Sequence, residues 1–200
     1  MISFGAHRCT LHCRNLRQLI MFAFKEWTLV CDALARGAQS LIIRKGGIAE
    51  GREGFRFKHS EFLLFPTLFH EQAAKLRVPT DTPLPSARTD GQHEIRLLAR
   101  AEWTRDVTDW DKVQPLEPFH LWSEGEIEKR FRQDDQPGVS VAFVRVFALS
   151  EPLVFPDLPK YGGCRSWIEV PDLPTDATLT PVIDNAAHRE REAALRAIVD

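Results

Sequence analysis

The stretch "GVSVAFVRVFAL", residues 138–149, decides the fold, because it reads more clearly as a β-strand than any other run in the chain. Valine and phenylalanine fill it, and such β-branched and aromatic side chains are enriched in strands. Residues 93–103, "HEIRLLARAEW", predict a second long strand. Shorter strands are expected in "QSLIIRK" (39–45), "EFLLFP" (61–66) and "CRSWIEV" (164–170).

Helical patterns lie between these strands. Apolar residues recur at helical spacing in 25–36, and Gly37 follows where a C-cap glycine belongs. Pro66 is expected to stop the strand before it, and Thr67 to cap a short helix over 68–77.

Two further helices are expected in the second half of the chain. Ser123 and Glu126 form a capping box at the start of a short helix. The tail 186–199 is amphipathic, so it predicts a helix with one apolar side.

Strands and helices do not alternate strictly, and several connections are long and rich in proline. This order favours an α+β fold with a mixed, mostly antiparallel sheet that is barrel-like and flanked by helices. A doubly wound sheet is the weaker alternative. Neither GxGxxG after a strand nor GxxxxGK[ST] occurs, which argues against dinucleotide and P-loop sites.

The chain divides into three parts by composition. Residues 1–20 form a basic extension without acids, and Met21 follows directly, so we expect translation to start at Met21; a short basic arm is the alternative. Residues 21–172 are expected to form one globular domain. Residues 173–200 are expected to be a linker and the amphipathic helix.

Composition excludes some classes of protein. No apolar run approaches the ~18 residues that span a bilayer, so no membrane association is expected. The four cysteines form no CxxC pair, which favours reduced thiols in a cytoplasmic protein. The net charge of −2 is near zero, so any basic surface must be local. No cofactor is indicated.

A local basic surface is predicted in the glycine-rich run "RKGGIAEGREGFRFK", residues 44–58. Its glycines leave backbone N–H groups open to an anion, and its phenylalanines interleave with the charges. The alternative without a binding function is a solvated loop whose phenylalanines enter the core. The predicted phosphate-contacting residues are Arg44, Lys45, Arg52, Arg56 and Lys58.

Aromatic side chains predict a pocket near this loop, although tryptophan more often belongs to a core. The predicted pocket residues are Trp27, Trp103, Trp110, Trp122 and His70.

An enzymatic alternative uses histidine and glutamate. A small hydrolase or nuclease would employ His59, Glu61, His70 and Glu71, provided that the fold brings them together. The HExxH zinc motif fails because Ala74 replaces the second histidine, and no lysine has an acid two residues before it. No metal site is therefore assigned.

Three segments carry a specific resemblance to a known family: "FKEWTLVCDALARGAQSLIIRKGGI" (24–48), "GFRFKHSEFLLFPTLFHEQAAKL" (54–76) and "VRVFALSEPLVFPDLPKYGGCRSWIEV" (144–170). They resemble an uncharacterised bacterial family, the domain of unknown function 1802, over about residues 22–172. Members of that family look associated with restriction-type nuclease domains, which implies a role in nucleic-acid defence. The family offers no catalytic residue to carry over.

The order of elements is also similar to PUA-like domains, including the ASCH and EVE groups. This resemblance implies a small β-barrel with flanking helices that holds RNA or a modified base. The favoured function is therefore a module that binds DNA or RNA and recognises a modified or flipped base. The alternatives are the hydrolase and a protein-interaction domain, in which the C-terminal helix docks a partner nuclease or a second copy.

Overall fold

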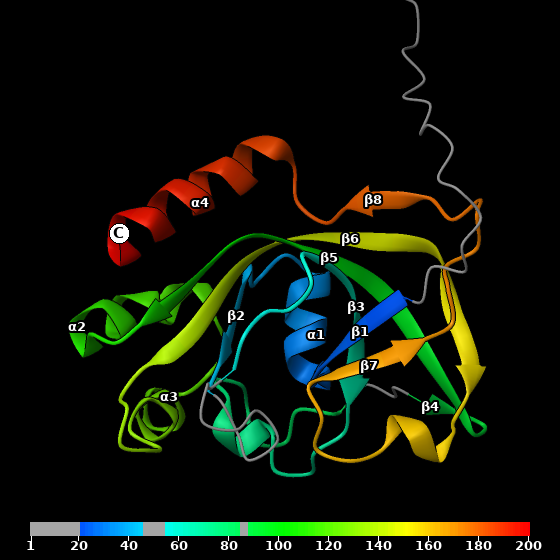
Figure 1. Cartoon of the computed structure of the whole chain (residues 1–200), viewed down its shortest axis with the longest axis horizontal. Helices are drawn as coiled ribbons and strands as arrows, with labels where there is room; N and C mark the ends of the chain where they lie inside the picture. The colour runs from blue at the N-terminus through cyan, green and yellow to red at the C-terminus, as the bar shows by residue number, and fades with distance from the viewer. Residues whose placement is uncertain (1–20, 46–54, 85–87) are drawn as a thin grey trace, which may run out of the picture.

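The fold comes from a computed structural model, which describes residues 21–45, 55–84 and 88–200. Helices and strands alternate irregularly along the chain, and Figure 1 labels them. The strands are β1 (Met21–Trp27), β2 (Leu41–Arg44), β3 (Glu61–Thr67), β4 (Arg88–Thr89), β5 (Gln92–Val107), β6 (Val139–Pro156), β7 (Trp167–Val170) and β8 (Leu179–Pro181). The α-helices are α1 (Thr28–Ala35), α2 (Trp110–Val113), α3 (Glu124–Phe131) and α4 (Asn185–Val199). Short 3₁₀ helices are η2 (Ala73–Lys75), η3 (Gln114–Phe119) and η4 (Pro159–Tyr161).

The strands form one mixed sheet in the order β2-β6-β5-β3-β1-β7, with β4 added to β5 and β8 added to β6. Only β1 and β3 run parallel among the described pairs; every other pair is antiparallel. No described pairing joins β2 to β7, so the sheet does not close. The predicted α+β class with a mostly antiparallel sheet is confirmed.

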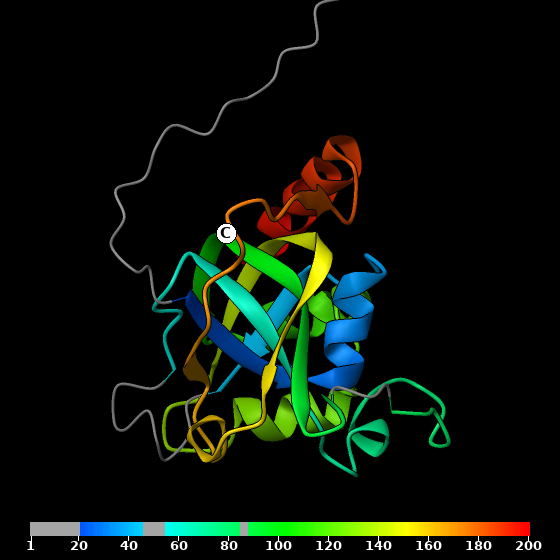
Figure 2. The same ribbon diagram turned by 90° about the vertical axis from the view of Figure 1, so that its right-hand side faces the viewer.

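β5 and β6 are the longest described strands of this sheet. They pair from Gln92–Pro156 to Val107–Val139, with register shifts between Ile95 and Leu97 and between Ala101 and Trp103. Such irregularities bend a strand pair and increase its twist. Figure 1 shows the two strands crossing the whole width of the molecule, and Figure 2 shows the sheet curling.

Each face of the sheet carries a hydrophobic cluster. Side chains alternate between the two faces of a strand, and neighbouring residues of β1 and β3 accordingly enter different hydrophobic clusters. Phe24 and Phe62 belong to one cluster, which also holds α1 and the helices α2 and α3. Ala23 and Leu63 belong to the other, which includes Tyr161 and β7. Burial on both faces explains why residues 139–146 are almost continuously apolar.

The C-terminal helix α4 packs on β5 and β6 of its own chain (Figure 1). Leu195 is fully buried, and the His188 ring stacks on Phe143 with centroids 4.6 Å apart. The buried Arg145 donates to the side-chain oxygen of Asn185 over 2.7 Å. Within the described ranges, no helix has both the length and the apolar composition that crossing a bilayer requires.

The helix predicted over 68–77 is wrong. Thr67 ends β3 and donates its hydroxyl proton to the carbonyl oxygen of Glu26 over 3.0 Å, so it does not cap a helix. Turns and the three-residue η2 follow. Pro66 lies inside β3 rather than stopping it. β5 pairs with β3 only as far as Leu63, so on that side the missing N–H of Pro66 costs no ladder hydrogen bond.

The first predicted helix begins later than expected. Residues 25–27 belong to β1, and α1 starts at Thr28. β1 lies between β3 and β7 and pairs with both, so tertiary hydrogen bonds override the local helical pattern. The strand predicted over 138–149 is confirmed and extends to Pro156.

Candidate nucleic-acid interface

The segment 55–59 is extended, and its side chains alternate in exposure. Phe55 is buried, while Phe57 and His59 are half-buried. Arg56 and Lys58 point to solvent. Phe55 and Phe57 each lie 5.8 Å from Phe24 between ring centroids, which anchors the segment on the core. The phenylalanines therefore hold the segment in place, and the basic side chains face outward because an extended chain alternates.

Arg56 and Arg105 line one shallow pocket of about 240 Å³. Phe55, Phe57, Thr104, Asp106 and Ser140 complete its lining. The Ser140 hydroxyl oxygen lies 2.5 Å from Oδ1 of Asp106 and 3.1 Å from the carbonyl oxygen of Phe55, which ties the segment to β5 and β6. The lining thus combines a hydrogen-bonded polar group with two arginine side chains.

The charges around this pocket differ in how firmly they are paired. Within residues 21–45, 55–84 and 88–200, neither Arg56 nor Lys58 forms an ion pair. Arg105 lies 3.4 Å from a carboxylate oxygen of Asp200, and both side chains are about half exposed. An exposed pair of this kind contributes only ~0–1 kcal/mol, so a stronger anion can displace it.

His59 ends the segment in an aromatic stack. Its ring lies 3.8 Å from the Phe22 ring at an interplanar angle of 14°, and Trp167 meets it edge-on at 4.9 Å. Burial, and then the charge of Lys58, lower the pKa of His59. The imidazole is therefore a neutral aromatic surface at pH 7 rather than a cation.

Arg44 turns inward instead of lining the rim. Glu26 is fully buried, and a buried carboxylate is costly unless it is paired. Its Oε2 lies 3.5 Å from Nη2 of Arg44, and its Oε1 accepts from the backbone N–H of Trp27 over 2.8 Å. The Arg44 guanidinium also donates to the carbonyl oxygen of Lys25 and lies over the Phe24 ring. Arg44 thus joins β2 to β1.

Arg130 of α3 completes this inner cluster. Its guanidinium lies 3.6 Å from the Trp122 ring centroid and 5.5 Å from that of Trp27. The two tryptophan rings are 4.5 Å apart. Burial, followed by the charge of Arg44, lowers the pKa of Arg130. Trp27 and Trp122 therefore lie together, and an arginine of the same chain covers them.

The other predicted residues lie apart from this cluster. Lys45 pairs with Asp134 at 2.9 Å. Trp103 stacks on Phe143, and Trp110 packs against Phe131 and lines a separate pocket. His70 is exposed in the turn after β3. Arg52 lies outside the described residues.

The four residues of the hydrolase hypothesis do not converge. His59 and Glu61 lie at one end of β3, and His70 and Glu71 lie beyond the other end. A seven-residue strand is ~20 Å long, at about 3.3 Å per residue. Glu61 instead pairs with Arg100 at 2.7 Å. Across the described part of the chain, no group of three or more His, Cys, Asp or Glu side chains is placed to hold a metal ion.

Sequence reasoning missed Arg105 and Arg130. Arg130 has a local signal, because Glu126 and Arg130 are four residues apart in a predicted helix, which places them on one helix face. Arg105 has none, since its position depends on which strand segment lies beside 55–57.

The fold and the site define an α+β domain with a curved mixed sheet and an outward basic edge. A family model described as "Domain of unknown function (DUF1802)" matches residues 23–194. The chain belongs to that family, which confirms the resemblance seen in the sequence. No curated protein matches the chain.

Two crystal structures are similar to the chain, and both are of the ASCH protein from Zymomonas mobilis. The first is a point mutant: identity is 10%, the TM-score is 0.43, and the match covers 89% of this chain and 97% of the other. The second has 10% identity and a TM-score of 0.41, and the match covers 90% and 96%.

Proposed function

We propose that this protein binds nucleic acid along the edge formed by segment 55–59 and the adjoining ends of β5 and β6. The observation that carries the proposal is the alternation in this segment. It sends Arg56 and Lys58 outward without a partner among the described residues, and it sets Arg56 beside Arg105 at one pocket. Guanidinium groups bind phosphate through paired hydrogen bonds, and a third basic group extends the contact along a backbone.

Rigid placement supports this proposal. Phe55 and Phe57 fix the segment on the core, so Arg56 and Lys58 lose little backbone entropy on binding. The stack of Phe22 and His59 offers a neutral aromatic surface at the end of the segment, where a base could stack. Lys45 and Arg105 would exchange their exposed carboxylate partners for phosphate.

The finer parts of the proposal rest on the family resemblance. They are recognition of a modified or flipped base, a role in restriction-type defence, and a partner nuclease. Self-association through α4 would have to use residues other than Leu195, which is buried against the sheet.

The test is a titration of labelled single- and double-stranded DNA and RNA at two salt concentrations. We expect binding that weakens steeply with salt, because each neutralised phosphate releases counterions. The double variant Arg56→Gln/Arg105→Gln should bind about tenfold more weakly and should lower the salt slope by roughly 1.5–2. The matched control is Arg36→Gln/Arg189→Gln, which removes the same charge from exposed positions at the C-cap of α1 and on α4. Absence of salt-sensitive binding to all four nucleic acids would reject the function.

A further inference from the structure

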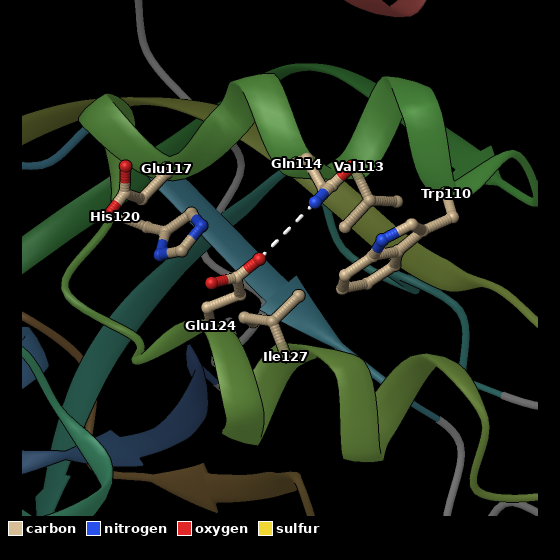
Figure 3. Close-up of a pocket in the computed structure, with 7 residues that line it drawn as sticks. All are labelled: Trp110, Val113, Gln114, Glu117, His120, Glu124 and Ile127. Atoms are coloured by element: carbon tan, nitrogen blue, oxygen red, sulfur yellow. Dashed lines mark hydrogen bonds between the residues drawn. The ribbon is translucent and has the colours of Figure 1, made fainter.

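A second pocket, of about 230 Å³, lies between α2–η3 and α3. Figure 3 shows side chains from the two helical layers pointing toward one another across it. The lining residues are Trp110, Val113, Gln114, Glu117, His120, Glu124 and Ile127. Val113 and Ile127 are buried and form an apolar wall, whereas the opposite end is polar. Pockets for drug-sized ligands measure roughly 300–1,000 Å³, so this one suits a single side chain or a molecule of similar size.

The pocket carries one negative charge in excess. Glu117 lies 3.3 Å from a guanidinium nitrogen of Arg77, which offsets its charge. Glu124 forms no ion pair with any residue that the structure describes; only the amide of Gln114 donates to it, over 3.3 Å. Glu124 opens α3, where the helix dipole stabilises a carboxylate. None of the described lining residues is basic, so the site suits one monovalent cation.

His120 supplies the pocket with a hydrogen-bond donor. It is 4% exposed, and its Nδ1 accepts a hydrogen bond from the backbone N–H of Trp122 over 3.0 Å. The neutral ring must therefore carry its proton on Nε2. That Nε2–H has no acceptor among the described residues, and His120 belongs to the pocket lining. His120 thus offers a donor to an oxygen of a molecule in the pocket.

The opposite side of α3 shows which cation a tryptophan ring and a glutamate carboxylate bind in this protein. There the chain places its own Arg130 guanidinium 3.6 Å from the Trp122 ring centroid and 3.3 Å from a carboxylate oxygen of Glu126. The pocket repeats the same two groups, an indole from Trp110 and a carboxylate from Glu124. The nearest described guanidinium, on Arg132, is 6.0 Å from the Trp110 ring and is paired with Glu128 at 3.0 Å.

We propose that this pocket binds a guanidinium group, which stacks on Trp110 and pairs with Glu124 while His120 donates to a neighbouring carbonyl oxygen. An arginine residue supplies both the flat cation and the carbonyl oxygen. A planar guanidinium suits an indole face and a carboxylate better than a compact ammonium does. This site is separate from the nucleic-acid edge, so either proposal can fail without the other.

The test is an NMR titration of the whole chain with N-acetyl-L-arginine amide, following the indole N–H resonances. We expect the Trp110 resonance to shift with a dissociation constant in the millimolar range. The uncharged isostere N-acetyl-L-citrulline amide should shift it far less, and N-acetyl-L-lysine amide should bind more weakly. Equal binding of the citrulline analogue, or no shift with the arginine analogue, would overturn the proposal. An arginine-containing peptide that binds more tightly than the amide would indicate a protein source, and equal affinity would indicate a small guanidine.

Matched variants on α3 separate the site from the fold. Glu124→Gln should weaken arginine amide binding about tenfold, because one charge-assisted hydrogen bond is lost. Glu128→Gln removes the same charge outside the pocket lining and should leave binding unchanged. Dispersed amide spectra of both variants would show that each is folded. If both variants weaken binding equally, the effect comes from overall charge and the assigned site is wrong.

Discussion

An indole and a carboxylate lie on each of the two sides of α3, but the two pairs differ in whether they bind an arginine of the chain itself. On one side, Trp122 and Glu126 hold Arg130 of the same chain, and its side chain is only 14% exposed. On the other side, Trp110 and Glu124 line a pocket with no basic side chain among its described lining residues. One helix therefore carries a filled arginine site and an unfilled one.

The difference shows how the same chemistry serves stability or binding. The cost of burying the Arg130 guanidinium is offset within the fold. Its charge pairs with Glu126, and its flat face lies on the ring of Trp122. Glu124 keeps contact with solvent and has no cationic partner among the described residues. A charged group that is paired within the fold stabilises the protein, whereas a charged group without an ionic partner is available to a ligand.

The largest expected effect on stability comes from removing Trp122, the tryptophan that lies against Arg130. Trp122→Ala should lower the free energy of unfolding by ~3–5 kcal/mol, because Trp122 is fully buried and its loss leaves a cavity beside Trp27 and Arg130. Trp110→Ala should cost clearly less, because Trp110 is only half-buried. Urea unfolding followed by circular dichroism measures both. Equal losses would mean that the two sides do not differ in packing.

A smaller effect is expected from pH at the unfilled side. Burial, and then the charge of Arg77, lower the pKa of His120 to about 4, and Glu117 and Glu124 are the acids lining the same pocket. Between pH 4 and 6.5 the unfolded chain binds more protons than the folded chain, so stability falls as pH falls through this window. The loss attributable to His120 is about 3 kcal/mol.

The measurement is urea unfolding at pH 7 and pH 4 for the parent protein and His120→Asn. Asparagine can accept the Trp122 N–H bond but does not titrate. The variant should therefore lose less stability on acidification than the parent does. Identical losses would show that His120 is not the group responsible.

The smallest expected effect on stability comes from the N-terminal cap of α3, which supports both sides of the helix. The Ser123 hydroxyl oxygen accepts from the backbone N–H of Glu126 over 3.4 Å and caps the helix. Ser123→Ala should cost ~1 kcal/mol of stability, and Ser123→Asn should restore most of it. Thermal unfolding of the three proteins measures the difference. A loss in the asparagine variant as large as in the alanine variant would exclude the cap as the cause.

Much of the fold could be predicted because its signals are local. The run of valine and phenylalanine in β6 and the amphipathic tail of α4 each specify their own structure. The Ser123 cap was also readable, although Glu126 turns its side chain to Arg130 instead of completing a capping box. β1 was not predicted, because its strand conformation depends on pairing with β3 and β7.

For the sites too, local patterns could be predicted from the sequence and long-range contacts could not. The basic and aromatic alternation in 55–59 was visible in sequence, since alternation is a local property of an extended chain. The predicted tryptophan pocket did not form as one unit, because Trp103 and Trp110 pack against other elements than Trp27 and Trp122 do. Sequence identified the aromatic residues but not their neighbours.

By itself the sequence determined that this chain forms an α+β domain of its family and that its positive charge gathers after β2. Only the tertiary structure decided that Arg44 turns inward to Glu26, that Arg56 lines one pocket with Arg105, and that Glu124 lines another with Trp110. The physical reason is that periodicity fixes the direction of a side chain along its own element. Strand register, bulges and helix packing fix which distant residue it meets.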